Sequence, residues 1–418
     1  MPINQRPIKK FTIKRNSMNT FILSNIVSLT FIGYYTLLLI YSNIISTESS
    51  RNITVPTRIV ILSCCFLLYV INIRKKSSNH RIFFLIFSTI YIIRIALDFV
   101  GGKYLYISYY ELTFYFLTFC FLPYLTVSKT DLTKINYESI FKTFLLYSLL
   151  FCFMTVYFYN EYIGNTARLS GIEDSSILSP LILSYCGSLV MGVLFFYIKY
   201  NQVSKFIKII SLITICLSII PFLLGASRGS IIAIFLPFII LISTQLNSLK
   251  MAYNIVAVVL VGYILFMTDT YLESGLFDRF LSIGEAVDSE SSSAIRLKIW
   301  ESSFNQFMKN PLIGDKIHND FFNQYPHNII LETLQSVGIL GFIPFFTLLI
   351  SGVYASFYIM KYHSSYAWIA VIYLQAFSQS LFSGALYSSA WFWLSLCLIL
   401  SLMYSLKNQI VSQKILEV

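Results

Sequence analysis

Long runs of apolar residues dominate the chain, and short polar connections separate them. A helix needs about 17 to 25 mostly apolar residues to cross the hydrocarbon of a bilayer, and these runs reach that length. Because lipid offers backbone amides no hydrogen-bond partner, each run is expected to be a helix rather than a strand. The pattern predicts twelve spans, near residues 21–45, 57–73, 82–100, 105–127, 141–159, 176–198, 206–224, 230–247, 252–270, 328–360, 366–382 and 389–406.

Composition supports a membrane protein. Hydrophobic residues make up 56% of the 418 positions and charged residues only 12%, which leaves too little polar surface to cover a soluble globule. All seven cysteines fall inside predicted spans, where cysteine behaves as a small apolar residue, so we expect no disulfide, metal or cofactor. The sequence therefore predicts an all-α, polytopic integral membrane protein in which residues 1–418 form one membrane domain.

The formal net charge of +11 is distributed unevenly along the chain. Most Lys and Arg residues lie in one alternate set of connections, which includes Arg74, Lys134 and Lys205, together with both chain ends. Positively charged short loops stay in the cytoplasm, so this set and both termini are predicted to be cytoplasmic. The basic excess therefore belongs to a membrane face, and no nucleic-acid partner is expected.

One connection, residues 271–326, is far longer than any other and is predicted to lie outside the cytoplasm, between spans nine and ten. Its stretch "SSAIRLKIWESSFNQFMKNPLIGD" carries Ile295, Ile299, Phe304, Phe307 and Met308 near helical spacing. This spacing predicts an amphipathic helix of roughly four turns over the membrane domain, ended by the "NPLIG" signal.

Polar residues cluster where the chain enters the tenth span, in "YPHNIILETLQ". A helix beginning at Pro326 would align Asn328, Glu332 and Gln335 in a stripe lining a protein cavity. His327 at its mouth would be kept neutral by the helix start and could act as a general base. Alternatively, His327 and Asn328 only cap the helix. Further along this span, Gly338 is predicted to mark a break.

Three arginines are candidates for binding an anion on the same side. Arg228 lies in the tight turn "GASRGS", where Ser227 and Gly229 could leave backbone amides exposed for a phosphate, unless the arginine merely snorkels. Arg296 lies on the predicted external helix, and Arg168 lies in "RLSGIED"; both could be ordinary solvated arginines. Within the third span, Arg94 and Asp98 are four residues apart and are predicted to pair.

Four segments in the same order resemble the bacterial superfamily of O-antigen polymerases and O-antigen ligases, which are polytopic glycosyltransferases. The resemblance covers roughly residues 160–350, and the N-terminal spans match only in hydrophobic character. The matching segments are "RLSGIED", "SRGSIIAIFLPFIIL", "RLKIWESSFNQFMKNPLIGD" and "YPHNIILETLQSVGILGFIPF".

This resemblance implies transfer of a glycan from undecaprenyl diphosphate to an acceptor hydroxyl at the periplasmic face of the inner membrane, without a metal. Arg228 and Arg296 resemble the arginines that meet the diphosphate, His327 resembles the histidine near the acceptor, and Arg168 is a further match. Asn328 or Glu332 would then orient His327 or bind substrate. The expected partners are the undecaprenyl-diphosphate-linked oligosaccharide, membrane lipid and a chain-length regulator protein.

The sequence leaves three functions open. The tetrad "YPHN" favours a polymerase, which joins one lipid-linked unit to another by inverting transfer. A ligase, which hands the glycan to lipid A core, is the first alternative. A lipid-linked oligosaccharide flippase is the second, although such transporters usually have repeated halves, and the long external loop has no counterpart earlier in the chain.

Overall fold

The regular structure is entirely helical in the described part of the chain. The computed structural model describes residues 6–44, 51–73, 78–103, 105, 107–162, 178–245, 248–272, 276–277 and 292–416. Within these ranges, ten helices or continuous runs of helical turns are long and apolar enough to cross a membrane. The prediction of an all-α polytopic membrane protein is therefore confirmed.

The helices coincide with the predicted spans, and two of them are shorter than the hydrocarbon is thick. Helices α10 and α15 have 16 residues each, which corresponds to about 24 Å against a hydrocarbon thickness of about 30 Å. Ten of the twelve predicted spans thus have full length. The helices are α1 (Arg6–Ser28), η1 (Leu29–Gly33), α2 (Tyr34–Ile44), α3 (Arg51–Asn72), α4 (His80–Val100), α5 (Tyr109–Tyr115), η2 (Phe116–Phe121), α6 (Leu122–Val127), η3 (Leu132–Lys134), α7 (Tyr137–Tyr159), η4 (Asn160–Tyr162), α8 (Pro180–Tyr200), α9 (Lys205–Gly225), α10 (Arg228–Ser243), α11 (Ser248–Leu272), α13 (Ser292–Lys309), α14 (Ile329–Tyr362), η7 (Ser364–Tyr366), α15 (Ala367–Phe382) and α16 (Ala390–Leu416).

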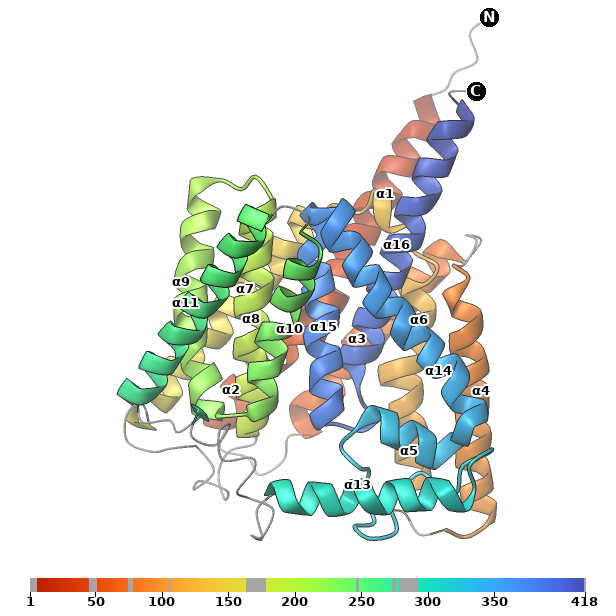
Figure 1. Cartoon of the computed structure of the whole chain (residues 1–418). Helices are drawn as coiled ribbons and strands as arrows, with labels where there is room; N and C mark the ends of the chain where they lie inside the picture. The colour runs from red at the N-terminus through yellow and green to blue at the C-terminus, as the bar shows by residue number, and fades with distance from the viewer. Residues whose placement is uncertain are drawn as a thin grey trace, which may run out of the picture.

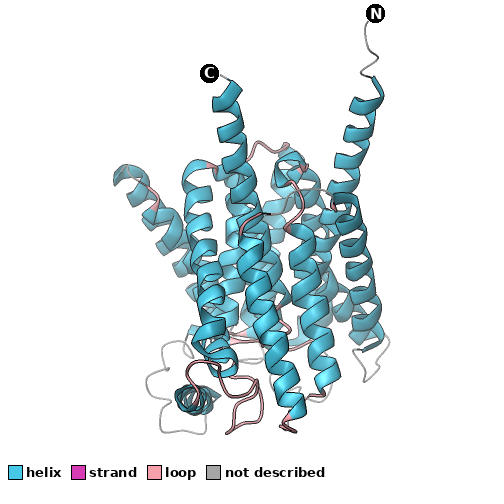
Figure 2. Cartoon of the chain, turned by 90° about the vertical axis from the view of Figure 1, so that its right-hand side faces the viewer, coloured by secondary structure: helices cyan, strands magenta, loops and turns pink. Residues whose placement is uncertain are grey.

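The long helices run roughly along one axis, whereas α13 lies across it at one end of the bundle (Figure 1). In the perpendicular view α13 is seen end-on, which agrees with this arrangement (Figure 2). The first residues of α1 and the last residues of α16 lie at the opposite end (Figure 1). We call the end that carries α13 the α13 end.

Helix α14 is broken at Gly338, as the sequence predicted. Gly338 has φ 59° and ψ −163°, a conformation that is essentially restricted to glycine. The break frees backbone groups, and the segment after α13 uses them: the Ile339 amide donates to the Pro311 carbonyl at 2.8 Å, and the Asp315 amide donates to the Gln335 carbonyl at 2.9 Å. The broken helix thereby fixes the segment that leads toward His327.

Two charged residues of α4 hold the same segment from the other side. Arg94 donates to the backbone carbonyls of Ile313 and Asp315, both at 2.7 Å, and Asp98 accepts from the Ile317 amide at 3.0 Å. Arg94 and Asp98 also form the predicted pair, with 3.5 Å between Nη1 and Oδ1. These side chains therefore replace water as hydrogen-bond partners for a loop that lies against the membrane domain.

Candidate functional site

The turn between α9 and α10, which precedes Arg228, is built from small residues because it packs tightly against α8. Ala226 adopts the left-handed conformation, with φ 40°. A Cβ atom on Gly225 would lie 2.2 Å from the Pro180 carbonyl oxygen, and one on Gly229 would lie 2.0 Å from the Tyr185 hydroxyl. Only glycine fits at both positions, so the turn and the start of α10 are held rigidly on α8.

Arg228 is the first residue of α10 and is half-buried at the α13 end. The expectation that Ser227 and Gly229 leave their amides exposed is wrong, because both residues are buried. The Ser227 amide instead donates to the Ser184 hydroxyl at 3.4 Å, and the Ser230 amide donates to the Ser227 carbonyl at 3.1 Å. The predicted anion site at this turn would therefore depend on the guanidinium of Arg228 rather than on these amides.

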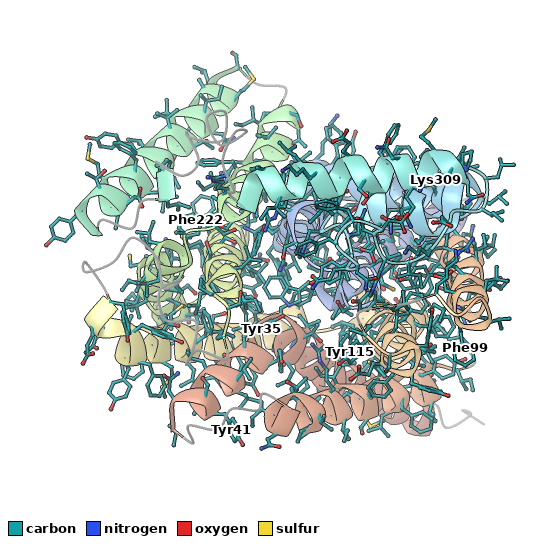
Figure 3. The ribbon with its side chains drawn as sticks, turned by 90° about the horizontal axis from the view of Figure 1, so that it is seen from below. Tyr35, Tyr41, Phe99, Tyr115, Phe222 and Lys309 are labelled. Carbon is teal, nitrogen blue, oxygen red and sulfur yellow. The ribbon has the colours of Figure 1, made fainter. Side chains whose placement is uncertain are left out.

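Helix α13 crosses over the end of the bundle and packs on α14. Viewed from the α13 end, it lies across the ends of the C-terminal helices, with Lys309 at its last turn (Figure 3). Of the apolar residues that predicted this helix, only Ile299 is fully buried, whereas Phe304 and Met308 are exposed. The inward face is largely polar: the Gln306 side chain donates to the His318 carbonyl at 3.2 Å.

The polar inward face of α13 holds the chain just before His327. Asn319 donates from its side chain to the Ser303 hydroxyl at 2.7 Å and to the Ile299 carbonyl at 3.2 Å. The Trp300 indole donates to the carbonyl of Pro326 at 2.9 Å. Arg296 lies one turn before Trp300, so the same helix that fixes the residue before the histidine also carries the arginine.

His327 has an unusual backbone conformation. Its φ is 57°, in the left-handed region, and its ring packs edge-on against Tyr325 with 4.5 Å between ring centroids. Burial lowers the pKa of His327 to about 4, and the positive charge of Arg296 adds to this shift. The imidazole is therefore neutral at pH 7, as predicted, although the causes are burial and Arg296 rather than the helix start.

Helix α14 begins at Ile329, so the predicted start at Pro326 is wrong. The Asn328 side chain caps the helix by accepting from the Ile330 amide at 3.0 Å and from the Leu331 amide at 3.2 Å. The helix cannot include Pro326 because His327, with φ 57°, and Asn328, in an extended conformation, interrupt the helical backbone between them. Asn328 thus has the capping role that the sequence left open.

Glu332 and Gln335 are both fully buried, which agrees with a polar stripe facing protein rather than lipid. Glu332 Oε2 accepts from the Leu386 amide at 2.9 Å, and the Gln335 side chain donates to the Ile317 carbonyl at 2.9 Å. The prediction that Glu332 orients His327 or binds substrate receives no support from this contact. The hydrogen bond from the Leu386 amide to Glu332 instead connects the first turn of α14 to the segment between α15 and α16.

Arg296 links the histidine to the turn that carries Arg228. Its charge acts on His327, and it also acts on Tyr185 of α8, whose hydroxyl lies close to Ser227. The structure therefore gathers Arg296, His327 and the start of α10 at one end of the bundle. Arg168, the third candidate arginine, lies outside the described residues.

A family model described as O-antigen ligase matches residues 212–315. The matched stretch contains Arg228 and Arg296 and ends before His327, and it covers less than half of the chain. It supports the superfamily of O-antigen ligases and polymerases, with a glycosyltransferase-like activity in O-antigen biosynthesis. With the apolar helices, the match indicates a multi-pass inner-membrane protein, and the matched family acts on lipid-linked oligosaccharide and membrane lipid. Among the curated proteins, no match was found.

Sequence reasoning missed two tyrosines that the fold brings to this site. Tyr387 lies in the connection before α16, with its ring centroid 6.1 Å from that of Tyr325 and 6.3 Å from that of His318. Tyr185 lies against Gly229 and near Arg296. Both lie far from His327 in sequence and within apolar surroundings, so only the fold connects them to the site. Among the residues with described side chains, no group of three His, Cys, Asp or Glu residues could hold a metal.

The pKa of His327 predicts an unusual pH profile for glycan transfer. A neutral base is retained down to low pH, so kcat/KM should stay level between about pH 7 and pH 5 and fall as pH approaches about 4. Arg296→Gln removes a charge that lowers this pKa, so its residual activity should be lost at a higher pH. Because the folded-state pKa is below the ordinary value, neutral His327 favours folding above about pH 6.5, and this contribution declines as pH falls toward about 4.

The measurement is kcat/KM against pH for the wild type, Arg296→Gln and Lys298→Gln. Lys298 is an exposed cation on the same helix, so its replacement should leave the acidic limb unchanged. An acidic limb near pH 6.5 in the wild type would contradict a depressed pKa at His327.

Proposed function

We propose that this protein is an O-antigen polymerase that transfers a glycan from undecaprenyl diphosphate to the sugar hydroxyl of another lipid-linked unit. The observation that carries the proposal is the convergence of Arg296 with His327 and with the turn of Arg228, at one end of a membrane bundle. Cations at the membrane surface suit an anionic lipid headgroup, and a neutral histidine suits proton removal from a hydroxyl.

In the proposed reaction, the guanidinium groups of Arg228 and Arg296 bind the diphosphate of the donor lipid. The acceptor hydroxyl attacks the anomeric carbon and forms a new glycosidic bond, while the bond from that carbon to the diphosphate oxygen breaks. The diphosphate leaves with the bonding electrons, and the arginines stabilise its growing negative charge. Direct displacement inverts the anomeric configuration.

His327 accepts the proton that the attacking hydroxyl loses. A base with a pKa of about 4 is weak, but the charge of Arg296 is one of the causes of that low value. A bound diphosphate would offset this charge and raise the basicity of His327 when donor is present. The positioning of the base and its activation are thus coupled to donor binding.

The proposed orientation has the α13 end in the periplasm and both termini in the cytoplasm. Lys134, Lys199 and Lys205 flank helices that end away from α13, and basic short loops remain cytoplasmic. This orientation would give the site access to donor lipids in the outer leaflet of the inner membrane. A protein that regulates chain length stays a prediction.

A ligase is the second candidate, because the family match carries that description. The two functions differ only in the acceptor, which is another lipid-linked unit for a polymerase and lipid A core for a ligase. The flippase alternative predicts translocation of the lipid-linked glycan without a new glycosidic bond.

The test uses purified protein in vesicles with lipid-linked repeat units as the only donor and acceptor, in excess chelator. The proposed polymerase should produce a ladder of longer lipid-linked glycans, and Arg228→Gln should reduce ladder formation by about 10²-fold or more. Product that forms only after lipid A core is added would instead identify a ligase. Translocation without any new glycosidic bond would contradict both.

A further inference from the structure

Helix α13 carries a row of large apolar side chains on the side that faces away from the segment it holds. Leu297, Phe304 and Met308 are seven and four residues apart, so they share one side of the helix. They are 49%, 49% and 57% exposed, whereas Ile299 and Gln306 on the opposite side are buried. Single exposed apolar residues are normal on a surface that faces water, but a continuous row indicates contact with another apolar surface.

The row continues beyond the helix and joins the outer surface of two membrane helices. Leu312 and Ile313, just after α13, are 64% and 56% exposed. The Leu312 carbonyl accepts from the amide of Leu340 on α14 at 3.1 Å, and the Ile313 carbonyl accepts from Arg94 on α4 at 2.7 Å. Leu340 is itself 54% exposed, close to the break in α14. We call the whole set the outer row, which consists of Leu297, Phe304, Met308, Leu312 and Ile313.

The outer row lies at the depth where the hydrocarbon of a bilayer would end. Helix α4 extends as far along the bundle as α13 (Figure 1), and it stays apolar to its end, with Leu97 52% and Val100 83% exposed. The part of α14 after its break, residues 338–362, is about 37 Å long, which is enough to cross a hydrocarbon layer of about 30 Å. Figure 2 shows α13 end-on at the margin of the bundle. The break in α14 and the segment docked on it are therefore at the boundary of that layer.

We propose that α13 is an interfacial helix whose outer row lies among the acyl chains of the leaflet at the α13 end. A helix of this kind buries its apolar side at the boundary between headgroups and acyl chains and keeps its polar side in water. The neighbouring flank of α13 fits this description, because Glu301, Asn305 and Lys309 are exposed there and line one open groove. The apolar side of the amphipathic helix thus contacts lipid, and the membrane domain contacts its polar inward face.

Continuity with α4 and α14 favours lipid over a protein as the occupant. A soluble partner that covered the outer row would also have to cover Leu340, which lies on a membrane-spanning helix. Lipid contact would have a consequence for Arg296, which directly precedes Leu297 on α13. A helix held at this boundary keeps Arg296 at the depth of lipid phosphates, where the diphosphate of a lipid-linked donor lies. This consequence rests on the proposed function, whereas the lipid contact itself does not.

The test places the photo-reactive residue p-benzoylphenylalanine at single positions of the full chain in vesicles of phosphatidylethanolamine and phosphatidylglycerol. After illumination, mass spectrometry detects lipid adducts and locates them on the acyl chain or the headgroup. Phe304 and Leu312 should give acyl-chain adducts in yields similar to those at Ile343, which is 58% exposed on α14 and is the positive control. Asn305, the matched control on the polar flank of α13, should give several-fold fewer acyl-chain adducts.

Replacement of Phe304 by another aromatic residue at an exposed position should leave the fold intact, and Leu312 provides an independent second position. Acyl-chain adducts at Ile343 but at neither Phe304 nor Leu312 would mean that the outer row faces water and would overturn the proposal. Cross-linked dimers at these two positions would also overturn it, because a second copy of the chain would then be the occupant. The readout is a mass, so it does not depend on glycan transfer or on the acceptor.

Discussion

His327→Asn is expected to lower the rate of glycan transfer by about 10²-fold or more while leaving the protein folded. A general base typically contributes 10² to 10⁴-fold, and the asparagine side chain cannot accept a proton at neutral pH. Asparagine is the most informative replacement because His327 has φ 57°, and asparagine tolerates left-handed backbone better than other non-glycine residues. The rate is measured with lipid-linked donor and the acceptor that supports wild-type turnover.

The matched control is His363→Asn. His363 follows α14 at the end of the bundle opposite His327, so its replacement should leave the transfer rate within about two-fold. His327→Gly adds a second comparison, because glycine adopts the same backbone without strain. Transfer at the wild-type rate in both His327 variants would rule out this residue as the base.

Gly338→Ala is expected to destabilise the folded protein by about 3 kcal/mol or more, because it combines backbone strain with a steric clash. A Cβ atom on Gly338 would lie 2.5 Å from the Gly314 amide nitrogen and from the backbone of Leu312. Backbone atoms cannot move aside as a flexible side chain would. The segment that docks on α14 and leads to His327 would have to detach, so glycan transfer should also be lost.

Gly102→Ala is the control for a positive φ without a steric clash. Gly102 has φ 62°, close to the φ of Gly338, but nothing lies within 4 Å of its added Cβ. Its cost should be about 1 kcal/mol. Thermal unfolding of both variants in the same detergent checks the prediction. Equal losses in Tm would mean that the segment does not pack tightly on the break in α14.

The spans and the break in α14 could be predicted because each rests on local chemistry. Lipid requires apolar runs to be helical, and the paired glycines of "GILG" signal a break within an apolar span. The inward face of α13 could not be predicted in the same way. Its apolar residues suggested a hydrophobic contact with the membrane domain. The inward face instead contacts the loop that follows α13, whose backbone groups need hydrogen-bond partners such as Gln306.

The candidate site was predicted in its residue types more than in its geometry. Arg296 and His327 are brought together because Trp300 fixes the Pro326 carbonyl, a contact between residues 26 positions apart that no periodicity reveals. The burial of Glu332 could be predicted from the polar stripe that it forms with Gln335, but its carboxylate accepts from the Leu386 amide, a partner that the sequence gave no reason to consider. Its role toward His327 or substrate stays a prediction.

The central claim is that arginines bind the donor diphosphate while His327 acts on the acceptor. The most direct test is the affinity of the purified protein for undecaprenyl-diphosphate-linked glycan, without acceptor, in the wild type, Arg296→Gln, Lys298→Gln and His327→Asn. The account predicts that Arg296→Gln weakens donor binding about 10-fold or more, and that the other two variants bind within about two-fold of the wild type. The account would be contradicted if Arg296→Gln bound the donor as the wild type does while His327→Asn failed to bind the donor.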